Sequence, residues 1–151
     1  MKAPFLVMVC ASLVLAAESS KEDPTKRDRE KLQGVWTLVA SEADGDKGFF
    51  QAGGKFSVEI KGDKYTLKVE MGKEKSSTEG TFKLDPSGKR KTFDFKYEEL
   101  GRKTPVEGIY ELDGDNLKLC FQIVEGRPRP KEFSAKKGSG QALMVWKREK
   151  H

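Results

Sequence analysis

The chain has a single histidine, which is its last residue, and only two cysteines, Cys10 and Cys120. The scarcity of histidine excludes most catalytic mechanisms that depend on an imidazole base. Two cysteines are too few for a disulfide scaffold or for a zinc site built from cysteines. With 151 residues, the chain is also too short for a two-domain enzyme. We therefore expect one domain without a metal or another cofactor.

The composition is that of a folded protein. Hydrophobic residues make up 36% of the chain and aromatic residues 9%, which excludes a disordered chain. The 29 lysines and arginines exceed the 24 acidic residues, and the formal net charge is +5. This excess is small, and acidic residues are interleaved with the basic ones throughout.

Residues 1–17 have the pattern of a secretory signal peptide. Lys2 gives a positive start, residues 5–15 form an apolar centre, and small residues before Ala17 offer a cleavage site. The apolar run is shorter than the roughly 20 residues that a membrane-spanning helix needs. A lipid anchor on Cys10 is disfavoured because a valine precedes it. We expect an exported protein without a transmembrane segment after cleavage, located in the periplasm, the cell envelope or outside the cell.

Residues 18–31 are expected to form a charged tether and a short helix. The charges that start at Glu18 disfavour the alternative in which residues 1–17 are a buried helix. Pro24 opens the segment that ends at Leu32, and proline is favoured in the first turn of a helix.

From Gly34 onward, apolar and polar residues alternate in eight runs. Alternation with a period of two indicates half-buried strands. The runs are residues 34–40, 55–61, 64–71, 79–84, 92–98, 106–112, 117–123 and 141–148. Turn sequences at 61–64, 85–88 and 113–116 join neighbouring runs. Because no helix falls between the runs, the strands are expected to pair antiparallel.

Eight sequential antiparallel strands can form a sandwich or close into an up-and-down barrel. Closure removes both sheet edges, and an eight-stranded barrel has room inside for side chains or one small ligand. We predict the all-β barrel, with residues 32–151 as the barrel domain.

The apolar positions of these runs are predicted to face the barrel interior. They are Trp36, Leu38, Phe56, Val58, Ile60, Tyr65, Leu67, Val69, Met71, Phe82, Leu84, Phe93, Phe95, Tyr97, Tyr110, Leu112, Leu117, Leu119, Phe121, Met144 and Trp146. None is charged, so a cavity lined by them would accept an apolar ligand but not an ionic group. The bulk of the side chains leaves a second possibility, which is that the interior is full.

The aromatic members of this set are the candidate ligand-binding residues. They are Trp36, Phe56, Tyr65, Phe82, Phe95, Tyr97, Tyr110, Phe121 and Trp146. For Trp36 and Trp146, a role in the barrel core is favoured over stacking on a ligand. The alternation of apolar and polar residues is weakest in the run 141–148, because Leu143 and Val145 are as apolar as Met144 and Trp146.

Cys120 is predicted to be an inert thiol. Its neighbours Leu119 and Phe121 share one face of a strand, so Cys120 faces the other side. A cysteine nucleophile needs a nearby base, and the sequence offers no histidine for that role.

Two resemblances to known families support these assignments. Gly34-Val35-Trp36 after a short helix resembles the first strand of the lipocalin superfamily. This implies a lipocalin-like (calycin-type) barrel in which a basic residue of the last strand, Arg148 or Lys147, packs over Trp36.

The second resemblance covers most of the chain after residue 31. The chain is similar to a family of uncharacterised exported domains that is abundant in planctomycete bacteria. The segments that carry this similarity are 32–36, 80–86, 108–115, 117–120, 129–133 and 138–140. The resemblance implies export and a lipocalin-like barrel, and it implies no activity.

The acidic motifs are interpreted as turns and surface. Asp44-Gly45-Asp46 and Asp113-Gly114-Asp115 lack the spacing and the late glutamate of a calcium loop, so turn chemistry is favoured. Glu98-Glu99 and the pair Glu107 and Glu111 are interpreted as solvated surface rather than as an acid and base pair.

Three basic segments could contact phosphate, anionic polysaccharide or lipid headgroups. They are residues 89–91, 102–103 and 127–137. Export disfavours nucleic acid as a partner, and ordinary solvation of these charges is the favoured interpretation.

These observations favour a non-enzymatic exported binding module with a small apolar ligand in the barrel. The alternative is an envelope or protein-interaction domain whose barrel is filled and whose basic loops make the contact. An enzyme is the least favoured of the three hypotheses, because no polar cluster in the sequence converges on the predicted interior.

Overall fold

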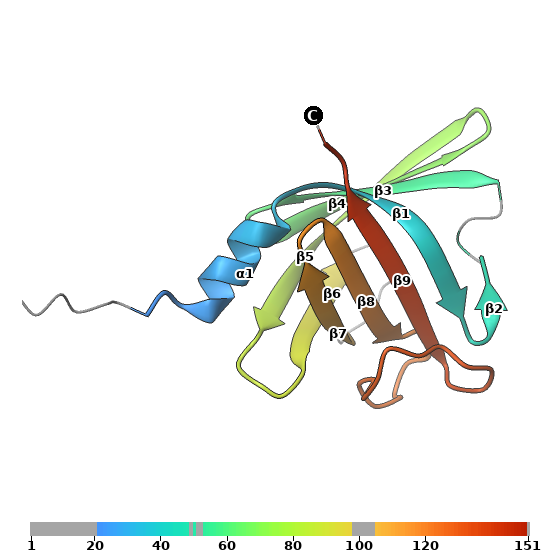
Figure 1. Ribbon diagram of the computed structural model, residues 1–151. Helices are drawn as coiled ribbons and strands as arrows, with labels where there is room; N and C mark the ends of the chain where they lie inside the picture. The colour runs from blue at the N-terminus through green and yellow to red at the C-terminus, as the bar shows by residue number, and fades with distance from the viewer. Residues whose placement is uncertain (1–20, 49, 51–52, 98–104, 151) are drawn as a thin grey trace, which may run out of the picture.

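Nine strands form one antiparallel sheet that closes into a barrel in the computed structural model of the chain (Figure 1). The structure describes residues 21–48, 50, 53–97 and 105–150, without the side chain of Tyr97. The strands are β1 (Gly34–Ala43), β2 (Asp46–Lys47), β3 (Gly54–Lys61), β4 (Lys64–Met71), β5 (Glu74–Asp85), β6 (Lys91–Tyr97), β7 (Val106–Asp113), β8 (Asn116–Gln122) and β9 (Gln141–Arg148).

The barrel consists of β1 and β3 to β9, and the pairing of β1 with β9 closes it. The short β2 pairs only with the end of β1. The predicted fold class, an all-β antiparallel up-and-down barrel with one short helix, is therefore confirmed, and the sandwich is excluded.

Two of the three predicted turns, at 61–64 and 113–116, are tight hairpins, whereas the turn at 85–88 lies in a longer connection between β5 and β6. Lys61 pairs with Lys64, and Asp113 pairs with Asn116, so each hairpin has a two-residue loop. Gly62 and Gly114 have φ angles of 64° and 56°, a conformation that favours glycine.

The hairpin of β4 and β5 is longer than the sequence predicts. β5 begins at Glu74 and pairs with β4 as far as Met71. This hairpin extends away from the barrel (Figure 1). Its side chains from Lys73 to Ser77 are exposed, so the apolar alternation that reveals a half-buried strand is missing there. The prediction that Met71 faces the interior is wrong, because its side chain is 49% exposed on this extension.

The helix α1 (Pro24–Leu32) lies at one end of the barrel (Figure 1). Asp23 caps it by accepting a hydrogen bond from the Thr25 amide at 3.0 Å, and Pro24 stands in the first turn. Asp28 and Leu32 are four residues apart and share one face. Both are buried, so this face is the one that contacts the barrel.

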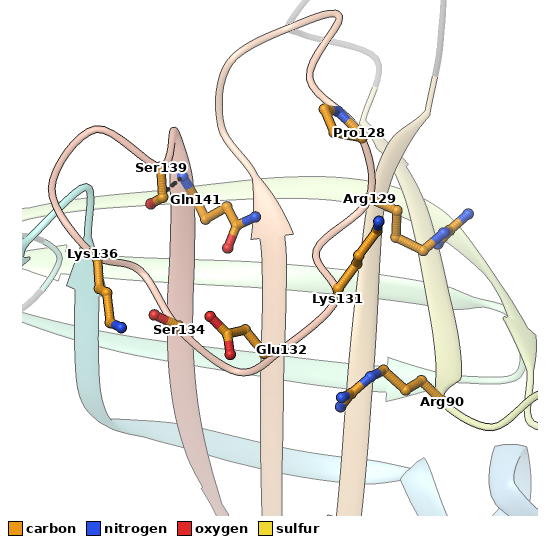
Figure 2. A pocket seen from close by; sticks show the side chains of 9 residues that line it. All are labelled: Arg90, Pro128, Arg129, Lys131, Glu132, Ser134, Lys136, Ser139 and Gln141. Carbon is orange, nitrogen blue, oxygen red and sulfur yellow. Dashed lines mark hydrogen bonds between the residues drawn. The ribbon is translucent and has the colours of Figure 1, made fainter.

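The loop of residues 123–140 lies against the outer surface of the barrel (Figure 2). Beneath it, Ile109, Cys120 and Leu143 form a cross-strand row on the outward face of β7, β8 and β9. Ala135 of the loop is 1% exposed, and Cys120 is fully buried. A second, smaller buried layer therefore lies outside the barrel wall.

Gly80 on β5 occupies a position where another strand and a ring approach closely. A Cβ atom at this residue would overlap the Lys96 carbonyl oxygen and the Tyr65 ring. We expect Gly80→Ala to lower the free energy of unfolding by about 1–3 kcal/mol, because the wall must shift to relieve this contact. Urea unfolding measures the loss, and Ser76→Ala is the contrasting variant because Ser76 is an exposed residue of the same strand. An equally small change in both variants would contradict this account.

Candidate functional site

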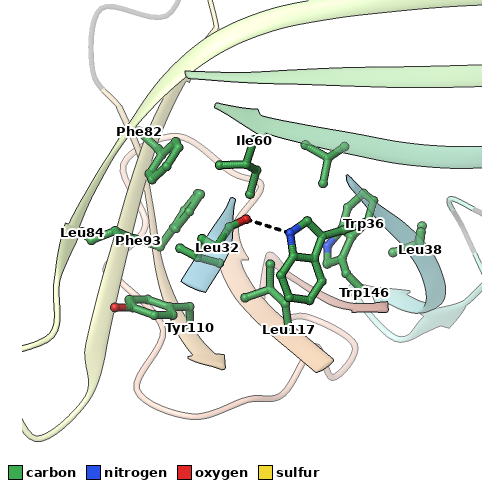
Figure 3. Packing of buried hydrophobic residues seen from close by; sticks show 11 residues of the cluster. Leu32, Trp36, Leu38, Ile60, Phe82, Leu84, Phe93, Tyr110, Leu117 and Trp146 are labelled. Atoms are coloured by element: carbon green, nitrogen blue, oxygen red, sulfur yellow. Dashed lines mark hydrogen bonds between the residues drawn. The ribbon is translucent and has the colours of Figure 1, made fainter. Parts of the chain in front are cut away.

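The barrel interior consists of a tightly packed half next to α1 and a more open half. The packed half contains Leu32, Trp36, Ile60, Phe82, Leu84, Phe93, Tyr110, Leu117 and Trp146, each less than 9% exposed. Figure 3 shows Leu32 of α1 among these side chains, with Phe82 and Phe93 side by side. Their rings stack at a centroid distance of 5.1 Å. No room for a ligand is expected where packing is this close.

Trp36 on β1 connects the barrel wall to the end of α1. Its indole Nε1 donates a hydrogen bond of 2.9 Å to the Leu32 carbonyl (Figure 3). The guanidinium of Arg148 lies over the Trp36 ring, 4.2 Å from its centroid. Arg148 also donates to the Gln33 carbonyl at 2.5 Å and forms an ion pair with Asp115 at 3.2 Å. Arg148, and not the exposed Lys147, is therefore the basic residue over Trp36.

A charged cluster that is not among the predicted site residues also lies at this end. Asp28 is 2% exposed and accepts hydrogen bonds from Lys91 Nζ at 2.6 Å and from Tyr110 Oη at 2.8 Å. Burial acts to raise the pKa of Asp28, but the bonds from Lys91 and Tyr110 and the charges of Lys91 and Arg27 together hold it below its ordinary value. Burial, followed by the adjacent Asp28 carboxylate, raises the pKa of Tyr110.

The expectation that no polar cluster converges on the interior is therefore wrong at this end. For Asp28 and Lys91, the sequence does contain a local sign that the side chain faces the barrel interior. Asp28 shares the helix face of Leu32, and Lys91 has the same strand parity as Phe93. The predicted run 92–98 starts one residue after Lys91, so it does not include this side chain.

The open half is lined by partly exposed aromatic residues. Phe56, Tyr65, Phe95 and Phe121 have inward parity, and all four are only partly buried. Phe95 meets Phe121 and Tyr65 edge to face, at centroid distances of 5.2 and 6.2 Å. Phe50 makes a similar contact with Phe56 at 6.3 Å. The predicted site residues therefore separate into a packed group, Trp36, Phe82, Tyr110 and Trp146, and this accessible group.

Two polar atoms of the interior wall are buried without a partner. Ser41 Oγ on β1 and Trp146 Nε1 on β9 have no hydrogen bond within the described part of the chain. Both strands are neighbours in the barrel. An unpaired buried polar atom costs stability, so Ser41, which lies outside the packed half, is a place where a polar atom of another molecule would be favourable.

Several predicted features lie outside the described residues. These are the signal sequence 1–17 with Cys10, the Tyr97 side chain, Glu98-Glu99 and the basic pair 102–103.

The acidic motifs within the described ranges are turns and surface. Asp44 and Gly45 form the turn between β1 and β2, with φ angles of 47° and 88°. Glu107 faces outward and forms an ion pair with Arg129 at 3.3 Å. In residues 21–48, 50, 53–97 and 105–150, no group of three or more His, Cys, Asp or Glu residues could hold a metal ion.

Cys120 is enclosed between the barrel wall and the covering loop. Its thiol donates to the Ser134 carbonyl of the covering loop at 3.4 Å. Burial raises the pKa of Cys120, which disfavours the thiolate that reactive cysteines need.

Comparisons with known proteins give similarity of fold only. No protein-family model matches the chain, and no curated protein matches it. One similar solved structure is described as the REP1-NXSQ fatty acid transporter, with 12% identity and a TM-score of 0.41 over 81% of this chain and 98% of that one. Another is a mutant of the fluorescent protein UnaG, with 15% identity and a TM-score of 0.40 over 81% and 99%.

Among the described residues, no helix has the length and apolar character needed to cross a membrane.

Proposed function

We propose that this protein is a non-enzymatic, lipocalin-like carrier that holds a small apolar molecule in the open half of its barrel. The observation that carries the proposal is the uneven burial of the inward aromatic residues. Phe56, Phe95 and Phe121 remain partly exposed although they face inward. Apolar surface that stays accessible inside a fold is typical of a ligand site.

The charge distribution of the interior favours an uncharged ligand. Among the described residues, the charged side chains that point inward are at the α1 end, where Asp28 pairs with Lys91 and Arg148 covers Trp36. A charged group placed in the open half would lose its hydration without gaining a partner. The unpaired Ser41 Oγ, outside the packed half, fits a ligand with one neutral polar atom.

Export of this carrier is proposed from residues 1–17 alone, because their pattern is that of a secretory signal peptide. An apolar molecule that must cross an aqueous space outside the cytoplasm is the cargo that such a carrier would suit.

Binding of an uncharged fluorescent probe, Nile red, tests the proposal. We expect Phe95→Asp to weaken binding more than about tenfold, because it places an unpaired charge in the apolar site. Val39→Asp is the matched control, since Val39 is 48% exposed and its substitution should leave binding unchanged. Circular dichroism confirms that each variant is folded before the titration.

Native mass spectrometry of the purified protein provides an independent readout. A stoichiometric extra mass that organic solvent removes would support carriage and would give the size of the ligand. Absence of both probe binding and extra mass would overturn the proposal in favour of a filled barrel that acts through its surface.

A further inference from the structure

A pocket on the outside of the barrel, formed by the loop of residues 123–140, is independent of the proposed interior site. It has a volume of about 510 Å³, which lies in the range of small-molecule sites. Figure 2 shows the loop crossing the outer face of the strands with the lining side chains around it. Its lining includes Arg90, Lys131, Lys136, Ser134, Ser139 and Gln141.

Three cations at this pocket have no ion-pair partner among the residues that the structure describes. Arg90, Lys131 and Lys136 are exposed, and none forms an ion pair within the ranges that the structure describes. Arg129 also lines the pocket, but its guanidinium is paired with Asp94 and Glu107. Glu132 is the acidic residue of the lining. The lining therefore has more free positive than negative charge.

Neutral polar groups complement these charges. The hydroxyl oxygen of Ser139 accepts a hydrogen bond from the Gln141 backbone N–H at 3.3 Å. The hydroxyl proton of Ser139 therefore remains available for donation to a ligand. Ser134 and the Gln141 side chain add further hydroxyl and amide groups. Glu132 offers a carboxylate acceptor for a hydroxyl group of a ligand. The site therefore combines anion-binding cations with donors and acceptors suited to hydroxyl groups.

The loop that forms the pocket is held at several points. Arg129 donates to both Asp94 oxygens and to the Gly108 carbonyl, the latter at 2.8 Å. Gly45 N donates to the Ala135 carbonyl at 2.6 Å, and Gly140 N donates to Asp44 Oδ1 at 2.9 Å.

These anchors hold both sides of the loop against the barrel, so little ordering cost remains when a ligand binds. An irregular loop longer than about 12–15 residues is uncommon unless it has a function.

We propose that this outer pocket binds a small oxyanion that carries hydroxyl groups, such as a sugar phosphate or a sugar acid. Lys131, Lys136 and Arg90 on different sides of the pocket supply the positive charge that attracts the oxyanion, while Ser134, Ser139, Gln141 and Glu132 offer partners for the hydroxyl groups. The proposal does not depend on the barrel interior, so an empty or filled barrel leaves it intact.

Amide NMR titration of the full chain with glucose 6-phosphate, with glucuronate and with uncharged glucose tests the proposal. We expect both anions to change the amide chemical shifts of residues 131–141. These changes should saturate by about 20 mM, as they would for a site with a millimolar Kd. Glucose should cause much smaller shifts. The double variant Lys131→Ala/Lys136→Ala should bind the anions about tenfold more weakly.

Lys64→Ala/Lys73→Ala is the matched control, because it removes the same charge from two exposed lysines on other turns. This control should leave the affinity within about twofold, since exposed charges beyond a Debye length are screened. Equal weakening in both double variants would show general attraction to a basic protein and would overturn the site. Absence of shifts at residues 131–141, or equal shifts with glucose, would overturn it as well.

Discussion

Leu32→Ala is expected to lower the free energy of unfolding by about 2–5 kcal/mol. Leu32 is fully buried and packs in the interior at the end that α1 covers. Alanine is a stronger helix former than leucine, so the loss reports the cavity rather than the helix itself. Urea unfolding followed by tryptophan fluorescence measures the change.

Val39→Ala serves as the comparison for this substitution. Val39 is 48% exposed on β1, and its truncation should change the stability by no more than about 0.5 kcal/mol. If Leu32→Ala costs as little as Val39→Ala, then α1 does not seal the barrel and our account of the packed half is incorrect.

Asp28→Ala is expected to lower the free energy of unfolding by about 2–4 kcal/mol. Removal of one member of a buried pair costs about 3–5 kcal/mol when the remaining charge stays buried. The cost here is somewhat smaller because the Lys91 side chain is 36% exposed and can become hydrated. Tyr110 also loses the acceptor of its buried hydroxyl group.

The pH dependence of stability separates the charge of Asp28 from its shape. The folded-state pKa of Asp28 is held below its ordinary value of 3.8, so its contribution is present above about pH 4. This contribution is lost as the pH falls through the folded-state pKa, because the carboxyl group must then be protonated.

Asp28→Asn keeps the side-chain volume and an acceptor for Tyr110 but removes the titrating group. We expect the stability difference between the wild type and this variant to shrink between about pH 5 and pH 2. A difference that stays constant over this range would show that the carboxylate charge does not stabilise the fold.

The alternation of apolar and polar residues was sufficient to predict the barrel wall. The predicted runs 64–71 and 141–148 coincide with β4 and β9, and the predicted turns at Gly62 and Gly114 are hairpins. The prediction was incomplete where the local signal is weak. The projecting part of β5 is exposed on both faces, and the two-residue β2 is too short to show a period.

The candidate site was only partly predictable, because side-chain parity does not report how tightly the interior is filled. Parity alone treats Phe82 and Phe95 as equivalent inward residues. The structure buries Phe82 under α1 and leaves Phe95 partly accessible. This difference follows from the position of the helix, which the strand pattern does not contain.

The sequence by itself determined the strands of the barrel wall, two of the tight hairpin turns and which side chains are apolar. These features depend on neighbours a few positions apart, so their signals are local. Only the tertiary structure brought Asp28 to Lys91 and Tyr110, which are 63 and 82 positions away. It also placed residues 123–140 over the outer wall, where Arg129 meets Asp94 from 35 positions away. Contacts of this kind depend on how the barrel closes, and no local pattern encodes them.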